Sequence, residues 1–274
     1  MDTVKKVPST IGLIIFSLMI LFALTGCDSE ETKAAKEGFK NEVARIQANY
    51  DALEAEIATA QELVTTEEVP LDKTLKPALE DTISDAKTIE FENPSMPSNP
   101  EEINAATEEL RSINYDDKVQ ALKDAETALS NSIEQRKLVT APSEAFVIER
   151  LRGIDGVGEI SALTEETDGN GILGKTGAYY AKIDFASPWV TNPFYSGKSV
   201  AENSTSGGGS VEVFETEELA EKRNDYLANF DGGWLSSGSH KVVGTLVVRT
   251  SDELTASQQK KLEADIIASL TKLQ

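Results

Sequence analysis

Residues Val242 to Arg249 read VVGTLVVR, and this stretch has the strongest strand pattern in the chain. Valine and leucine here combine high β-propensity with burial, which predicts one continuous strand. The same reading gives three further strands: Ile160–Leu163, Ala178–Phe185 and Ser210–Phe214. Amphipathic spacing gives three helices: Ser143–Leu151, Thr216–Phe230 and Thr255–Leu273. This order predicts an α+β domain, a small and mostly antiparallel sheet with helices on one face.

Upstream of Ala141-Pro142 the chain is rich in Ala, Glu, Leu and Lys, and its apolar residues follow a heptad pattern. The spacing alternates between four and three residues over the following positions: Phe39, Val43, Ile46, Tyr50, Leu53, Ile57, Ala60 and Val64. Two more helices are expected, at Asp72–Ile89 and from Pro100 to near Ile133 with a phase shift around Asn114. No single helix can bury such a stripe alone, so we expect an antiparallel three-helix coiled-coil bundle.

The chain's only cysteine, Cys27, stands at the end of its longest apolar run. Lys5 and Lys6 precede that run, Ile11–Leu24, which carries no charge. As a helix the run would reach about 21 Å, short of the ~30 Å of a bilayer's hydrocarbon layer. These are the proportions of a cleaved signal peptide.

The residues Leu24-Thr25-Gly26-Cys27 resemble the lipobox of bacterial lipoproteins. The resemblance implies that the Cys27 thiol receives a diacylglyceryl group and that cleavage makes Cys27 the new N-terminus. The protein would then be anchored in the cell membrane and face outside. The alternative is a signal anchor in which the cysteine is incidental. The expected organisation is 1–26 signal peptide, 27–140 helical bundle or spacer, and 141–274 compact α+β domain.

Two further resemblances cover the rest of the chain. The segments ALEDTISDAK and EEINAATEELRSI resemble the FIVAR-type three-helix modules of very large bacterial surface proteins. The segments TEETDGNGILGKTGAYYAKIDF, VEVFETEELAEKRNDYLANFDG and GSHKVVGTLVVRTSDELTASQQ resemble the C-terminal domain of a group of Gram-positive lipoproteins. That group has no established activity, so the resemblance implies a location and a fold but no catalytic residue.

The formal net charge is −21, with 47 acidic and 26 basic residues. Such a surface excludes nucleic acid as a partner, because binding to phosphates requires clustered basic residues. It also opposes adhesion to anionic lipid. The anchor on Cys27 is therefore the predicted link to the membrane.

Residues that could carry chemistry are few. His240 is the only histidine, with Ser237 and Ser239 nearby, and this segment is expected to form a turn before a strand rather than a catalytic triad. A zinc site would need several His or Cys ligands, which the sequence does not have. Gly207–Gly209 lacks the lysine that follows the glycines of a phosphate-binding loop, so we expect a flexible turn there. We therefore expect no cofactor.

A calcium interpretation applies to the stretch from Glu166 to Gly171, ETDGNG. Asp168 and Asn170 are the candidate ligands, because alternate oxygen donors followed by Gly open an EF-hand loop. Two features oppose it: the first position is Glu, and Gly177 stands where a bidentate Glu belongs. The alternative is a structural turn between two strands.

Four aromatic residues in predicted loops are candidates for ligand contact: Trp189, Phe194, Tyr195 and Trp234. They could stack on a sugar or hold a peptide, or they could simply cover the edges of a small sheet. Arg249 is expected to face either a ligand or Asp252.

The sequence therefore favours a non-catalytic lipoprotein that binds a protein, a peptide or a cell-wall glycan, or that acts as a spacer. The alternative is a hydrolase of wall or extracellular polymer that uses two carboxylates. A pair of carboxylates facing one another in an aromatic-lined cleft would favour the enzyme. Most acids of the compact part, such as Glu217-Glu218 and Asp252-Glu253, are expected on helices and turns, where water keeps them ionised.

Overall fold

The computed structural model describes residues 29–232 and 238–273, and it confirms an α+β protein. The predicted signal peptide, Cys27, Trp234 and Ser237 lie outside the described residues. No helix within the described ranges is both long and apolar enough to cross a membrane. The first four helices are α1 Glu30–Thr65, α2 Leu75–Ala86, α3 Pro100–Arg111 and α4 Asp116–Leu138. The remaining helices are α5 Glu144–Leu151, α6 Val200–Asn203, α7 Glu217–Ala228 and α8 Ala256–Leu270, with the 3-10 turns η1 Pro193–Tyr195 and η2 Ser204–Gly207.

The predicted third helix is two helices, because the chain turns between Arg111 and Asp116. The Asn114 side-chain oxygen accepts a hydrogen bond from the Asp116 amide at 2.6 Å. An Asx turn of this kind competes with helical hydrogen bonds and starts a new helix. The phase shift in the apolar pattern around Asn114 marks this break.

Contacts divide the described residues into two compact units, one with residues 29–45 and 93–113 and the other with residues 46–92, 114–232 and 238–273. In the first unit, Phe39 of α1 and Ile103 of α3 are among the buried residues. There the Arg45 guanidinium donates to the carbonyls of Leu110 and Ile113 at 2.9 and 3.4 Å. A cation therefore adds a charged donor at the end of α3, where the Leu110 carbonyl also accepts from the Ile113 amide at 3.1 Å.

In the second unit, side chains from α1, α2 and α4 share one hydrophobic cluster. Its buried members are Leu53, Ile57, Ala60, Leu79, Ile83, Ala86, Leu122, Leu129 and Ile133. Leu53, Ile57 and Ala60 belong to the predicted apolar stripe of the first helix, so the periodicity located the buried face of α1 in this unit.

The sheet has five antiparallel strands in the order β1-β2-β3-β5-β4. The strands are β1 Ile160–Ala162, β2 Ala181–Ala186, β3 Gly208–Val213, β4 His240–Val243 and β5 Leu246–Thr250. The prediction of one strand over Val242–Arg249 is wrong, because the chain reverses at Gly244-Thr245 and Val243 pairs with Leu246. Gly244 has φ +58°, as at the first central position of a type II′ hairpin turn.

Gly208 and Gly209 belong to β3 and not to a flexible turn. A Cβ on either would lie within 2.4 Å of atoms of Phe185. The glycines are therefore needed for close packing of β3 against β2.

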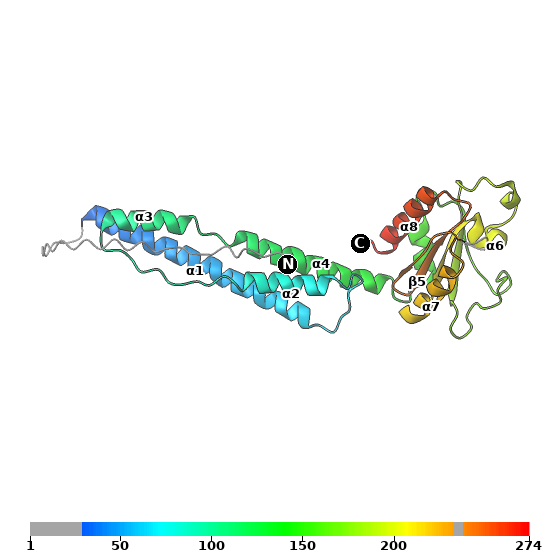
Figure 1. The fold of residues 1–274 in the computed structure, drawn as a ribbon, viewed down its shortest axis with the longest axis horizontal. Coiled ribbons are helices and arrows are strands. Elements are labelled where there is room, and N and C mark those ends of the chain that lie inside the picture. Colours follow the sequence, from blue (N-terminus) through cyan, green and yellow to red (C-terminus); the bar gives the residue numbers. More distant parts are fainter. Residues whose placement is uncertain (1–28, 233–237, 274) are drawn as a thin grey trace, which may run out of the picture. The chain divides into compact units, whose positions relative to one another are not determined.

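Helices cover both faces of the sheet, which corrects the prediction that they lie on one face (Figure 1). One face packs against α5 and α8 through a core that includes Phe185, Val248, Leu151 and Leu262. The other face packs against α7, where Ala220 and Leu227 join a smaller cluster. Because α7 covers this second face, the polar side chains beneath it are buried and not solvated.

The end of α4 is part of the core of the sheet. Val139 is fully buried there, and its carbonyl accepts a hydrogen bond from the Thr245 amide at 2.9 Å. The Thr245 hydroxyl accepts in turn from the Ala141 amide at 2.7 Å. The predicted boundary between residues 140 and 141 thus falls inside the second unit. That residues 143–274 fold cooperatively when expressed alone is a prediction.

The substitution Gly244→Ala tests the importance of this hairpin. The added Cβ would lie 2.3 Å from the Val139 carbonyl oxygen, a backbone atom. Gly153→Ala is the matched control, because Gly153 also has positive φ, +78°, but open space around it. We expect the control to cost about 1 kcal/mol of unfolding free energy and Gly244→Ala at least ~2 kcal/mol more, measured by urea unfolding. Equal losses would contradict the described contact.

Candidate functional site

The face of the sheet beneath α7 carries an unusual row of polar side chains. Cross-strand pairing aligns Ser161, Asp184, Ser210, Arg249 and His240, one from each strand. Asp184 is 1% exposed and Ser210 is fully buried. Charged residues are rarely buried unless they are paired, so the buried charges on this face are expected to belong to a polar network.

The neighbouring row contains Glu212, which is 0% exposed. Arg223 of α7 donates to both of its carboxylate oxygens, at 2.7 and 3.0 Å. Arg249 of β5 donates to Glu212 Oε1 at 2.7 Å. We call these three residues the Glu212 clamp, since one carboxylate joins the helix to the sheet.

Ionisation of Glu212 is stabilised within this clamp. Burial opposes the charge, but hydrogen bonds and the positive charges of Arg223 and Arg249 outweigh it, so the pKa of Glu212 lies below its ordinary value of 4.5. Both oxygens are occupied by guanidinium groups, which leaves the carboxylate no free oxygen directed at a substrate.

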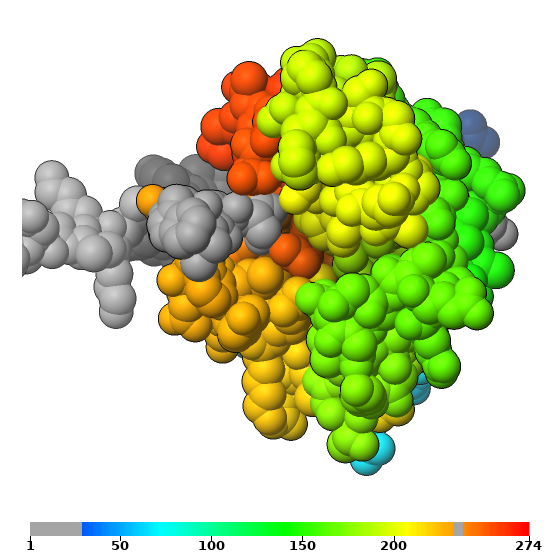
Figure 2. Space-filling view, turned by 90° about the vertical axis from the view of Figure 1, so that its right-hand side faces the viewer, coloured from blue at the N-terminus to red at the C-terminus, as the bar shows by residue number. Residues whose placement is uncertain are grey.

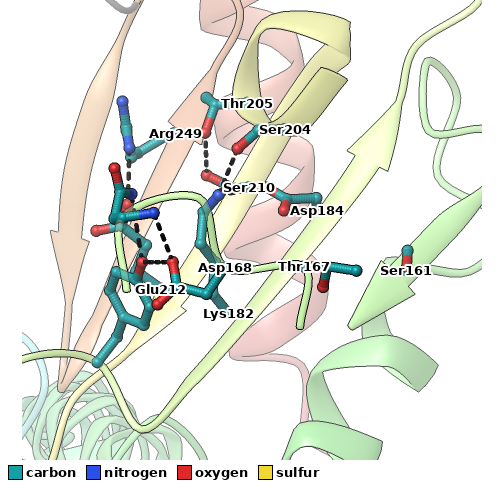
Figure 3. A network of polar contacts seen from close by, with 12 residues as sticks. Ser161, Thr167, Asp168, Lys182, Asp184, Ser204, Thr205, Ser210, Glu212 and Arg249 are labelled. Atoms are coloured by element: carbon teal, nitrogen blue, oxygen red, sulfur yellow. Dashed lines mark hydrogen bonds and ion pairs between the residues drawn. The ribbon is translucent and has the colours of Figure 1, made fainter. Parts of the chain in front are cut away.

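A second network on the same face joins Lys182, Asp184 and Ser204 (Figure 3). Lys182 Nζ lies 2.7 Å from Asp184 Oδ1 and donates to the Ser204 hydroxyl at 2.6 Å. The short ion pair lacks hydrogen-bond geometry, and both Asp184 oxygens are without a hydrogen-bond partner among the described residues. Burial is the main reason that the pKa of Asp184 is raised.

Ser204 is held in a strained backbone conformation, with φ +48° and ψ −144°. Next to it, the hydroxyls of Thr205 and Ser210 lie 2.8 Å apart. Lys182 acts on Ser204 as a hydrogen-bond donor, whereas a general base would have to accept the serine proton. The arrangement therefore fixes the turn between α6 and β3 and does not activate Ser204.

The two buried carboxylates are relevant to the hydrolase alternative. Asp184 and Glu212 lie on adjacent strands and point to the same face of the sheet, and the pKa of Asp184 is raised while that of Glu212 is lowered. A glycosidase separates the pKa values of its acids in this way. The prediction that the acids lie on helices and turns is wrong for this pair. Because the Glu212 clamp saturates Glu212, the pair lacks the free second carboxylate that the reaction requires.

Beside the clamp lies an open hollow of about 410 Å³ between α7 and the loop that precedes β2. Its lining includes apolar Ile172, Phe214 and Leu219 and cationic Lys175, Lys222 and Arg223. We call it the Lys222 hollow. Figure 2 shows the green loop and the gold helix side by side on one face of the molecule. An apolar floor with charged groups at its rim is a common design for small ligand sites.

The aromatic candidates have different roles. Trp189 is half-buried against the main core, and its ring covers Gly156, where an added Cβ would lie 2.6 Å away. Phe194 is 67% exposed and stacks edge-on against Tyr195, with their ring centroids 5.2 Å apart. Lys198 Nζ lies 3.6 Å from the Phe194 ring centroid. Trp189 is therefore a packing residue in this structure, and Phe194 with Tyr195 forms a surface pair.

The candidate calcium loop is organised around Asp168. Its Oδ2 accepts from the amides of Ile172 and Leu173 at 2.6 and 2.7 Å, and Oδ1 accepts from the Asn170 amide and the Tyr179 hydroxyl, each at 3.1 Å. Burial and the Asp168 charge raise the pKa of Tyr179 to about 12, so its hydroxyl stays a donor. Among the described residues no group of three acidic, His or Cys side chains could hold a metal ion. These contacts favour the structural interpretation of the loop.

His240 and Arg249 also have internal partners. His240 Nδ1 lies 2.8 Å from Asn224 Oδ1 and Nε2 lies 3.1 Å from Asp231 Oδ1. Ser239 pairs with Thr250 through their hydroxyls at 2.8 Å and not with the imidazole. Arg249 faces Glu212 and not Asp252, which corrects that expectation.

Comparison of the chain with protein-family models, with curated proteins and with solved structures finds no match. Apart from Arg249 and His240, the residues that form the polar face and the Lys222 hollow were missed by sequence reasoning. The alternation in Lys182-Ile-Asp184-Phe and in Ser210-Val-Glu212-Val was visible as a polar face. Nothing local indicated that α7 would cover that face.

The Glu212 clamp can be tested with Glu212→Gln. Removing the charge leaves two guanidinium groups without a carboxylate, so we expect a loss of about 3–5 kcal/mol of unfolding free energy at pH 7. Because the folded-state pKa is lowered, the contribution of Glu212 is complete above its unfolded pKa and is lost as the pH falls through the folded value, below 4.5. The difference between wild type and variant should therefore shrink in acid. Glu218→Gln, which removes an exposed ion pair with Lys222, is the control and should change stability little.

The Asp168 loop provides a second test. Asp168→Ala removes the acceptor for three amides, so we expect a lower melting temperature, equivalent to about 1–2 kcal/mol. The size of the loss should be the same with and without millimolar calcium. A melting temperature that rises strongly with calcium in the wild type, and not in the variant, would show that the loop is a metal site.

Proposed function

We propose that this chain is a lipid-anchored protein of the bacterial cell surface whose α+β part binds a ligand and has no catalytic role. The motif Leu24-Thr25-Gly26-Cys27 supports the anchor. It stands directly before α1, which begins at Glu30. Two acyl chains on Cys27 would hold the protein stably, since one chain gives only reversible binding.

The helical part is proposed as a bundle that serves as a spacer. Its support is the cluster shared by α1, α2 and α4. The helix α1 alone has 36 residues and is about 54 Å long at ~1.5 Å per residue. The proposed ligand is outside the cell, where a protein, a peptide or a cell-wall glycan is available.

The geometry of the polar face supports binding over hydrolysis. Glu212 is saturated by two arginines, and Lys182 donates to Ser204. These contacts support a role of the charges in stabilising the fold, and Lys182, as a donor to Ser204, does not act as a base that accepts the serine proton. One observation favours the hydrolase alternative: burial raises the pKa of Asp184, as a general acid requires. Such an enzyme would need a second carboxylate other than Glu212.

Metabolic labelling tests the anchor. Cells that express the full chain and grow with a fatty-acid analogue should label the wild type, and Cys27→Ala should lose the label and appear in the soluble fraction. Ser29→Ala, two positions downstream, is the matched control and should keep both label and membrane association. Equal labelling of the wild type and Cys27→Ala would refute the anchor.

A further inference from the structure

The Lys222 hollow has a charge opposite to that of the chain as a whole. The protein carries a net charge of −21, yet Lys175, Lys222 and Arg223 line this one hollow, and its lining contains no carboxylate. Fixed charges of one sign in a concave surface concentrate ligands of the opposite sign.

The three cations differ in how far they are already neutralised. Lys175 is exposed, with no ion pair among the described residues. Lys222 pairs with Glu218 at 2.8 Å, but both side chains are mostly exposed, so water competes for that pair. Arg223 uses Nε and Nη2 for Glu212, which leaves its Nη1 group free of any described partner. Each cation therefore keeps a donor for a ligand.

The backbone adds donors at the same place. Residues 175 to 178 form a turn in which the Ala178 amide donates to the Lys175 carbonyl at 2.9 Å, with Gly177 at φ +81° in the position that type II turns reserve for glycine. The amides of Thr176 and Gly177, both in the lining, have no hydrogen-bond acceptor among the described residues. Successive free amides of this kind attract anions.

The rest of the lining is apolar except for Tyr179, whose hydroxyl donates to Asp168. Phe214 is 2% exposed and Ile172 and Leu219 are half-buried, so the floor is carbon-rich and rigid. The Glu212 clamp fixes the side chain of Arg223 at its edge. A bare inorganic anion would leave this floor without a contact.

We propose that the Lys222 hollow binds a ligand with one anionic head group, a carboxylate or a phosphate monoester, carried on a short apolar body. The head group is held by Lys175, Lys222 and the amides of Thr176 and Gly177, and the apolar body lies against Phe214 and Leu219. This inference rests on the proposed binding role of the α+β part and is independent of the lipid on Cys27.

Lysine acylation of the full chain in detergent measures occupancy residue by residue. Butyl phosphate or butyrate, at four times its dissociation constant, should slow acylation of Lys175 and Lys222 about fivefold, read by peptide mass spectrometry. Lys241 and Lys260 are exposed lysines outside the hollow and should be unaffected. The stronger of the two probes identifies the preferred head group.

Two variants and two further probes complete the test. Lys222→Gln should abolish protection of Lys175, whereas Glu218→Gln, which frees Lys222, should strengthen protection of both lysines. Protection by butan-1-ol equal to that by the butyl anions, or equal protection of Lys241, would overturn the anion site. Inorganic phosphate that protects as well as butyl phosphate would overturn the role of the apolar floor. A wild type that is lipid-labelled at Cys27 but shows no lysine protection would refute this site alone.

Discussion

The arrangement of the α+β part depends on one buried carboxylate that must be neutralised. Glu212 is completely removed from water, and a lone ion in that position would cost several kcal/mol. Its partners come from two elements, Arg249 from the sheet and Arg223 from α7. The helix is therefore held over this face by a charge requirement as well as by the apolar contacts of Ala220 and Leu227.

The position of α7 determines the surface beside it. Lys222 and Leu219 lie on the same helix as Arg223, so the clamp that satisfies Glu212 also places the rim and part of the floor of the Lys222 hollow. At the other end of the polar face, Asp184 forms an ion pair with Lys182, and neither of its oxygens has a hydrogen-bond partner among the described residues. Fully satisfied polar networks fix a structure, whereas incompletely satisfied ones are where proton transfer or water is expected. Both ends of the face therefore contain a buried polar atom without a hydrogen-bond partner among the described residues, Arg249 Nε in the Glu212 clamp and the Asp184 carboxylate in the second network.

Local sequence patterns predicted much of the secondary structure. The apolar stripe around Leu53 and Ile57 located a buried helix face, and the stretches at Ile160, Lys182 and Val211 became β1, β2 and β3. The hairpin was missed because the Gly244-Thr245 pair, a local turn signal, lies inside a continuous run of strand-forming residues. The approach of Val139 to Gly244 is a long-range contact, from more than a hundred residues earlier in the chain, and no local pattern indicates it.

The candidate site was the least predictable part for the same reason. The polar side chains of β2 and β3 alternate as they would on a solvated sheet, and only the packing of α7 turns them into a buried network. For Trp189 the error was the opposite. Its position in a predicted loop suggested an exposed side chain that contacts a ligand, but its ring packs against Gly156, which has no side chain. A single sequence shows which side chains of a strand share one face of the sheet, but it does not show which helix packs on that face.

The contact between Val139 and Thr245 also determines where a force along α4 reaches the sheet. The Thr245 amide and hydroxyl hold the end of α4, and the Thr245 carbonyl accepts from the Phe214 amide next to β3. Tension that travels along α4 therefore enters the sheet at the turn of the β4–β5 hairpin, where β4 is an edge strand and β5 pairs with β3. A load applied there acts on the two bonds from Thr245 to the Val139 carbonyl and on the bond from the Phe214 amide to the Thr245 carbonyl, so several hydrogen bonds share it.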